Sequence, residues 1–221
     1  MTIALGINFG DYILLAADTR TTFGWPNYKI GYTDETEKIQ KTSCGLITGA
    51  GRTVLLDSVK IRLAKQEITN SDQIFEIIKE QRLSLLREAA ITANDIAMTG
   101  WIFSYMTILN DATKLRLDVV HPSLAEGSVR WEENKAAVIC PVEATKQEAN
   151  AIIETLNDAI KPFPEFTTVE QSYQYHAQVI AALIRKIQPS YPSISRYIQI
   201  GIHKLDGSIE ISSVTPIDKP E

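Results

Sequence analysis

Hydrophobic residues alternate with small or polar residues at the beginning of the chain. A period of two predicts a β-strand, and the apolar positions are Ile3, Leu5, Ile7 and Phe9. Gly10 and Asp11 then mark a turn, and the apolar residues 12–17 predict a second strand that is buried on both faces. We expect this hairpin to hold the start of the chain inside a sheet, whereas free chain ends usually fray.

Periodicity along the rest of the chain predicts further strands and helices in blocks. Residues 21–36 are polar and contain glycine, proline and asparagine, which predicts a long loop with at most a short strand. Apolar residues at helical spacing predict four helices: one after Gly51, one over residues 72–90, one begun by Pro141 and stopped by Pro162, and one over residues 168–187 that opens with a capping box of Thr168 and Gln171. The other predicted strands are one opened by Lys38 and Ile39 and those at residues 45–48, 101–109, 115–119, 129–131, 136–140, 197–203 and 209–214.

The order of these elements predicts an α+β fold. Two hairpins precede two helices, about four strands follow, and two more helices precede a C-terminal hairpin. Pairs of helices between blocks of antiparallel strands indicate four layers, with two sheets inside and helices outside, an αββα sandwich. No linker, repeat or shift in composition divides the sequence, so we expect one domain over residues 1–221, with residues 215–221 as a tail.

Composition argues against several classes of protein. The 221 residues carry a net charge of −5, with 22 Lys and Arg against 27 Asp and Glu and no basic cluster, which argues against nucleic-acid binding. There is no signal peptide and no apolar run long enough to span a membrane, so we expect a cytoplasmic protein. Cys44 and Cys140 are expected to be buried hydrophobes, and neither they nor the three histidines have a metal-binding spacing. We therefore expect no metal and no organic cofactor.

The usual local signatures of nucleophilic enzymes are missing, and Thr2 offers another route to catalysis. The sequence contains no GxSxG, SxxK, P-loop or GxGxxG motif. If Met1 is removed, the Thr2 hydroxyl can attack an amide and the α-amino group of the same residue can accept the proton. An α-amino group has a pKa of about 8, which suits a general base near neutral pH. The small side chain of Thr2 suits removal of Met1 by an ordinary methionine aminopeptidase.

The first part of the chain runs from Thr2 through a strand, Gly10 in the turn and a second strand to the segment Ala-Ala-Asp-Thr-Arg at residues 16–20. This order and spacing resemble the opening of proteasome β-type subunits and of their bacterial relatives HslV and Anbu. Residues 37–39 resemble their catalytic-lysine strand, and residues 45–51 resemble the strand and glycine turn before their first helix. The resemblance is specific over residues 2–65 and architectural from there to residue 214. It implies the N-terminal-nucleophile (Ntn) hydrolase fold.

The resemblance implies a role for each matching residue. Thr2 would be the nucleophile, Lys38 would place a positive charge beside it, and Asp18 would hold Lys38 in place. The Gly49 N–H would stabilise the developing oxyanion, and Arg20 would order the loop near Asp18. A weak preference for hydrophobic substrates is expected, and the residues implied to lie near the substrate pocket are Thr21, Ile47 and Gly51.

Two segments depart from the pattern of active family members. Those members carry Gly-Ser-Gly before the third helix, where this chain has Ile-Cys-Pro-Val at residues 139–142. They also place an Asp and a Ser after the fourth helix, where residues 189–195 contain no Asp and offer Ser193 or Ser195 as the serine. The sequence therefore leaves the support of the amine of Thr2 undefined.

The resemblance implies a threonine-type peptidase or amide hydrolase that forms an acyl-enzyme on Thr2. Two other functions stay open: transfer of the acyl group to an amine, as in a transpeptidase, and a non-catalytic scaffold subunit of a proteasome-like assembly. The expected partners are a peptide or protein substrate and further copies of the chain in a ring or helical array. Nucleic acid and membranes are not expected, and the sequence leaves open whether a regulatory ATPase takes part.

Overall fold

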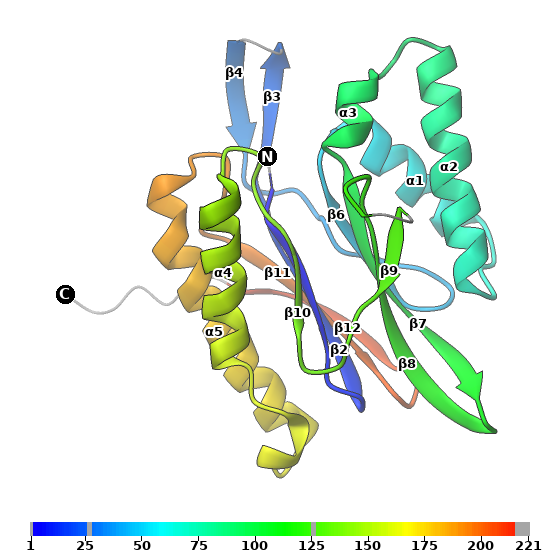
Figure 1. The fold of residues 1–221 in the computed structure, drawn as a ribbon, viewed down its shortest axis with the longest axis vertical. Helices are drawn as coiled ribbons and strands as arrows, with labels where there is room; N and C mark the ends of the chain where they lie inside the picture. The colour runs from blue at the N-terminus through cyan, green and yellow to red at the C-terminus, as the bar shows by residue number, and fades with distance from the viewer. Residues whose placement is uncertain (1, 26–27, 125–126, 215–221) are drawn as a thin grey trace.

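The computed structural model describes residues 2–25, 28–124 and 127–214. Within these residues the chain is a mixed α/β protein with five α-helices, two five-stranded antiparallel sheets and a separate two-stranded hairpin (Figure 1). The strands are β1 (Ala4–Asn8), β2 (Tyr12–Asp18), β3 (Thr21–Trp25), β4 (Tyr28–Thr33), β5 (Gln40–Lys41), β6 (Leu46–Ala50), β7 (Gly100–Leu109), β8 (Ala112–Val120), β9 (Ser128–Arg130), β10 (Ala136–Ile139), β11 (Ile198–Lys204) and β12 (Ile209–Val214). The helices are α1 (Thr53–Lys65), α2 (Ser71–Arg87), α3 (Ala93–Ala97), α4 (Lys146–Ala159) and α5 (Val169–Ile187), and two 3-10 turns are Phe163–Glu165 and Gln188–Ser190.

The first sheet, in the strand order β10-β1-β2-β11-β12, holds the start of the chain. β1 and β2 form the predicted hairpin, in which Leu5 lies opposite Ala16 and Gly6 lies opposite Leu15. Leu5 and Ala16 belong to the core on one face of the sheet, and Leu15 belongs to the core on the other face, as a period of two requires. Gly10 turns the chain with a φ of 86°, a conformation that favours glycine.

Three groups of buried hydrophobic side chains join the sheets and helices. The first lies between the β10-β1-β2-β11-β12 sheet and helices α4 and α5, and the second lies between the β5-β6-β7-β8-β9 sheet and helices α1 and α2. The third joins the facing surfaces of the two sheets. Figure 1 shows the two helix pairs on opposite sides of the sheets. Representative members are Leu5 and Ile184 in the first group, Leu55 and Trp101 in the second, and Leu15 and Ile102 in the third.

Residues 21–36 contain a hairpin where the sequence pattern predicted a long loop. β3 and β4 pair in antiparallel fashion, with Thr21 opposite Thr33 and a register shift after Phe23; residues 26–27 of this segment lie outside the described residues. Threonine, phenylalanine and tyrosine favour extended backbone, and here they outweigh the glycines on which the loop prediction rested. In Figure 1 this hairpin stands out from one end of the two sheets.

Pro141 does not begin a helix, contrary to the sequence prediction. α4 begins at Lys146, and Thr145 caps it. The Thr145 hydroxyl accepts from the Glu148 N–H at 3.2 Å, and the Glu148 carboxylate accepts from the Thr145 N–H at 2.7 Å. This reciprocal capping box satisfies two N–H groups at the helix start, and it fixes that start more strongly than the preference of proline for a first turn.

Two further helix starts differ in part from the prediction. Thr168 caps α5 as predicted, but the Gln171 side chain accepts from the N–H of Thr167, so the reciprocal half of the capping box is missing. α3 was not predicted from the sequence. It has only five residues, too few for a hydrophobic period, and a capping box of Thr92 and Asp95 holds its start.

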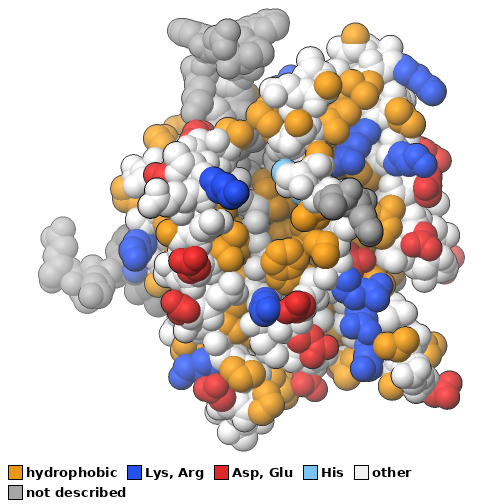
Figure 2. Space-filling view, viewed as in Figure 1, with side chains coloured by type: hydrophobic (Ala, Val, Ile, Leu, Met, Phe, Trp, Pro, Cys, Tyr) orange, Lys and Arg blue, Asp and Glu red, His pale blue; other side chains and the backbone are white. Residues whose placement is uncertain are grey.

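The two cysteines are less buried than the sequence analysis predicted. Cys44 and Cys140 are free thiols that are half-buried, and burial raises the pKa of Cys140 to about 11. Figure 2 shows hydrophobic side chains gathered in the middle of one face, with side chains of both charges around them. None of the helices in the described part of the chain combines the length and apolar character needed to cross a membrane.

A buried histidine should make the fold sensitive to acid. The ring of His203 in β11 is buried, its Nδ1 lies 3.0 Å from the Ser104 hydroxyl, and burial lowers the pKa of the ring from 6.5 to about 4. The folded state therefore keeps this ring neutral while the unfolded chain takes up a proton below pH 6.5. The resulting stability is complete above pH 6.5 and decreases as the pH falls to about 4, by about 3 kcal/mol in total.

The measurement is urea unfolding at several pH values for the wild type and for His203→Gln. The excess free energy of unfolding of the wild type over the variant should shrink by about 3 kcal/mol between pH 7.5 and pH 4. Parallel pH curves for the two proteins would contradict the assignment.

Candidate active site

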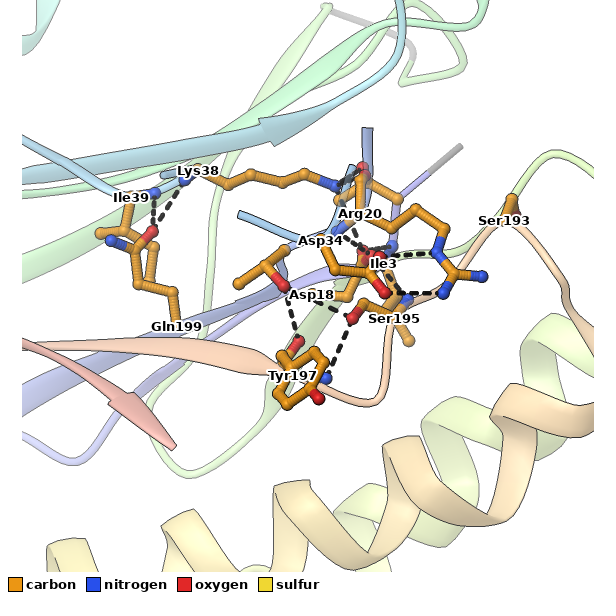
Figure 3. Close-up of polar contacts among 12 residues, drawn as sticks. Ile3, Asp18, Arg20, Asp34, Lys38, Ile39, Ser193, Ser195, Tyr197 and Gln199 are labelled. Atoms are coloured by element: carbon orange, nitrogen blue, oxygen red, sulfur yellow. Dashed lines mark hydrogen bonds and ion pairs between the residues drawn. The ribbon is translucent and has the colours of Figure 1, made fainter. Parts of the chain in front are cut away.

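Three of the residues that the sequence indicated meet beside the start of β1. Thr2 lies two residues before β1, Asp18 is the last residue of β2, and Lys38 lies two residues before β5. The Lys38 Nζ donates to the Thr2 Oγ1 and lies 3.5 Å from the Asp18 Oδ1. All three side chains are buried. The sequence predicted that Lys38 opens a strand, but the structure places it in the segment before β5. Its side chain reaches across to Asp18 (Figure 3).

Asp18 joins three segments of the chain through its carboxylate. Its Oδ1 accepts from the Ile3 N–H at 3.0 Å, and its Oδ2 accepts from the N–H groups of Arg20 at 2.9 Å and Ser195 at 3.0 Å. The side chain is fully inaccessible to solvent. A carboxylate with three backbone donors and a neighbouring ammonium is held rigidly, so Asp18 fixes both the start of β1 and the end of the Lys38 side chain.

Arg20 extends this network to the β3–β4 hairpin and the loop after α5. Its guanidinium binds the Asp34 carboxylate through two parallel bonds of 2.7 Å and 2.8 Å, and it donates to the Pro192 carbonyl at 2.7 Å. Its own carbonyl accepts from Lys38 Nζ. The bond to Asp34 raises the pKa of Arg20 and lowers that of Asp34, so both stay charged. Arg20 thus links the segment after Asp18 to the β3–β4 hairpin and to the loop after α5.

Burial dominates the electrostatics of the central pair. Burial raises the pKa of Asp18, against the opposing effects of the Lys38 charge and the three backbone N–H groups. Burial likewise lowers the pKa of Lys38, against the charges of Asp18 and Asp34. Each charge stabilises the other in a site with little water. A lysine in this setting can place a positive charge against the Thr2 oxygen, and a positive charge there favours the ionised form of the hydroxyl.

The site opens into a cavity of about 690 Å³. Thr2, Lys38 and Gly49 line one part of it, and other parts are lined by α1, by the segment after α2 through α3, by the start of the β3–β4 hairpin and by residues 142–143. An added Cβ at Gly49 would come within 2.5 Å of the Gly100 carbonyl of β7, so the close approach of the two strands requires glycine here. The cavity has the size of a small-molecule or peptide side-chain site.

Two of the three residues expected at the substrate pocket line this cavity. Thr21 and Gly51 are part of its wall. Gly51 has a φ of 136°, and an added Cβ there would collide with Thr99. Ile47 is fully buried in the core that joins β6 to α1 and α2, and it is not among the lining residues. Alternation along β6 explains this: Ile47 points to the helices, on the side away from the facing sheet.

The structure separates the two serines that the sequence could not distinguish. The Ser195 N–H donates to Asp18, and its hydroxyl lies 3.4 Å from Thr19 Oγ1 and accepts from the Tyr197 N–H at 3.0 Å. The Ser193 hydroxyl instead donates to Glu143 at 3.0 Å. Ser195 is therefore in direct contact with Asp18, and Ser193 lies beside that network in Figure 3 without a drawn contact to it.

Sequence analysis missed several side chains that complete the site. Asp34, at the end of the β3–β4 hairpin, supplies a carboxylate near the loop where the sequence lacks one. Glu143, directly after the segment where Gly-Ser-Gly is missing, lines the cavity. Lys60 in α1 donates to the carbonyl of Lys38, and Gln199 in β11 accepts from the N–H of Lys38. Only Lys60 had a sequence signal, because it interrupts the apolar stripe of α1 four residues after Leu56.

The described residues hold no group of three or more His, Cys, Asp or Glu side chains that could bind a metal ion.

The chain matches no model of a known protein family and no curated protein sequence. Solved structures do match it. Two structures of Anbu from Hyphomicrobium sp. strain MC1, one of them a Gly-1 mutant, superimpose with TM-scores of 0.66 and 0.64. They cover 99% and 98% of this chain and 89% of each Anbu chain, at 14% sequence identity.

The chain shares its fold with Anbu. The likeness to a proteasome-type protein, which the first 65 residues suggested, is therefore confirmed for the fold. At 14% identity the likeness to Anbu is one of fold alone. The chemistry must be argued from the site itself.

Proposed function

We propose that the chain is an Ntn hydrolase that uses Thr2, freed by removal of Met1, to cleave amide bonds of peptides or proteins. The observation that carries the proposal is the contact of the Lys38 ammonium with the Thr2 hydroxyl, in a network held by Asp18 and open to a cavity. The Anbu fold supports it. The finer architecture that we propose is the four-layer αββα sandwich of Ntn hydrolases, formed as one domain.

The proposed reaction proceeds through an acyl-enzyme. The Thr2 Oγ1 bonds to the substrate carbonyl carbon, and its proton moves to the α-amino group of the same residue. The positive charge of Lys38 stabilises the attacking oxygen, and the Gly49 N–H is the proposed donor to the oxyanion. The C–N bond then breaks as the leaving amine takes the proton from the α-amino group. Water attacks the ester in the same way, releases the carboxylic acid and restores Thr2.

The test compares two forms of the protein by intact mass after treatment with a threonine-directed β-lactone. One form begins at Thr2, released from a cleavable fusion, and the other retains Met1. We expect the first form to gain the mass of one lactone and the second to gain nothing, because its α-amino group belongs to Met1. Equal labelling of the two forms, or labelling of neither, would contradict the mechanism. The second result would favour the non-catalytic scaffold, and an amide product formed with excess added amine would identify a transpeptidase.

We also propose that the chain forms a homo-oligomer. Val54 and Ile61 lie seven residues apart on one side of α1 and are 45% and 55% exposed, and Phe23 and Tyr32 are exposed on the hairpin. Light scattering at micromolar concentration should therefore give a multiple of 24.6 kDa, and Ile61→Glu should lower that mass if this face of α1 is in the interface. A wild-type mass of one chain would show that the proposal is wrong.

A further inference from the structure

We infer that Lys60 and Gln199 are positioning residues that hold the backbone of Lys38, and through it the ammonium at Thr2. The inference rests on the proposed function for its catalytic consequence. Its structural part, that these two side chains order the Lys38 segment, can be tested without any activity.

The Lys38 segment lacks the support that strands usually give. Residues 35–39 belong to no helix or strand, and β5, which follows, has only the two residues Gln40–Lys41. The backbone of Lys38 is nevertheless buried, and buried N–H and C=O groups need partners. Side chains from two other elements supply these partners.

Gln199 supplies the acceptor. Its Oε1 lies 2.7 Å from the N–H of Lys38 and 2.7 Å from the N–H of Ile39, so that one oxygen accepts from two successive residues. Gln199 is buried in β11, where it faces Ala17 of β2. Since Asp18 follows Ala17 directly, the same end of the paired strands β2 and β11 holds both the Lys38 segment and the carboxylate that the Lys38 side chain meets.

Lys60 supplies the donor from the opposite side. Its Nζ donates to the Lys38 carbonyl at 2.7 Å, and the Gln40 side chain donates back to the Lys60 carbonyl at 3.1 Å. Lys60 is buried on the face of α1 that otherwise carries Leu56 and Leu63. An ammonium is costly to bury, and an aliphatic side chain would fill this face more easily. The bond to Lys38 is therefore the reason for a lysine at this position.

Together the two side chains hold one peptide unit from both ends. The Lys38 side chain must span the distance from this unit to Thr2, so a shift of the unit moves the ammonium away from the Thr2 oxygen. Misplacement of a catalytic group by about 1 Å can lower a rate by about 100-fold. Lys60 also lines the cavity, but the positioning role does not require it to touch a substrate.

The experiment measures amide hydrogen exchange of residues 37–41 and the rate of β-lactone acylation in the protein that begins at Thr2. We expect the amides of Lys38 and Ile39 to be protected in the wild type. In Lys60→Met and in Gln199→Leu they should exchange at least about 10-fold faster, and the maximal acylation rate should fall by about 10-fold with little change in lactone affinity. Lys60→Arg, which keeps a charged donor, should restore part of the rate. The matched control is Lys65→Met, a substitution of an exposed lysine on the same helix.

Each result decides the inference. Fast exchange at Lys38 and Ile39 in the wild type overturns it without any variant, which also covers the case of variants that fail to fold. Unchanged exchange in folded Lys60→Met and Gln199→Leu overturns it as well. A protein that shows the protected amides and their loss, but that the lactone does not label, keeps the positioning role and rejects the proposed function. Labelling at wild-type rates in both variants rejects the catalytic consequence alone.

Discussion

Replacing Thr2 with alanine should abolish labelling by the β-lactone while the protein stays folded. The change removes the hydroxyl that the Lys38 Nζ contacts, whereas the Asp18 carboxylate and the Arg20 carbonyl also lie against this ammonium. Those two acceptors remain, so the buried ammonium keeps partners. We expect a loss of about 1 kcal/mol in the free energy of unfolding. Intact mass and urea unfolding of the protein that begins at residue 2 are the measurements.

Two comparisons show whether the hydroxyl and the amine of Thr2 act as a pair. Thr2→Ser keeps both groups and should retain part of the labelling. Acetylation of the Thr2 amine keeps the hydroxyl but removes the base, and it should stop labelling with the side chain unchanged. Labelling of Thr2→Ala at the wild-type rate would place the nucleophile elsewhere and end the Ntn interpretation.

Local patterns predicted most of the strands and helices because each carries a regular period. The β1–β2 hairpin combines an alternating strand with a glycine turn, and β7 and β8 meet at Asn110 and Asp111, both with positive φ as a tight hairpin turn requires. The long apolar stripe of α5 likewise predicts a helix over the whole of that segment. These elements are set by neighbours in sequence, which a single sequence displays.

Elements whose local sequence signals are mixed or compete with one another were harder to predict. The β3–β4 hairpin has mixed composition, and its pairing is visible only in the structure. The start of α4 moved from Pro141 to Lys146 because a capping box competes with proline, and both signals lie within a few residues. Such competition is decided by small differences in free energy that pattern analysis does not measure.

The candidate site shows the same division. Thr2, Asp18 and Lys38 could be identified because they lie in a short segment whose spacing resembles a known family, and the structure brings them into contact. Asp34 and Gln199 act from segments with no motif, and their roles follow from tertiary contacts alone. Residues 189–195, in the loop after α5, contain no Asp, and in the structure Arg20 binds both Asp34 and the Pro192 carbonyl of that loop.

Asp18→Asn should cost the protein both stability and activity, and the structure explains why the two losses belong together. The carboxylate accepts from the N–H groups of Ile3, Arg20 and Ser195 and lies beside Lys38. An asparagine has one oxygen to offer, so its NH₂ group must face at least one backbone N–H, and a donor then opposes a donor.

The substitution also leaves the Lys38 ammonium without its buried counter-charge. Breaking a buried ion pair from one side costs about 3–5 kcal/mol, and we expect a loss of this size in urea unfolding. Because the Asp18 charge raises the pKa of Lys38 against the effect of burial, its removal lowers that pKa further and favours the neutral amine. Acylation of Thr2 by the β-lactone at pH 7 should then slow by about 100-fold.

Asp34→Asn is the matched control, because it removes a partly exposed carboxylate that binds Arg20 and whose charge acts on Lys38 more weakly than the charge of Asp18 does. It should lower the free energy of unfolding by about 1 kcal/mol and change the acylation rate much less than Asp18→Asn does. If both variants slow acylation equally, the network acts only by ordering the loops, and the charge of Asp18 has no separate role at Lys38. If Asp18→Asn alone loses the rate, the buried pair of Asp18 and Lys38 sets the reactivity of Thr2.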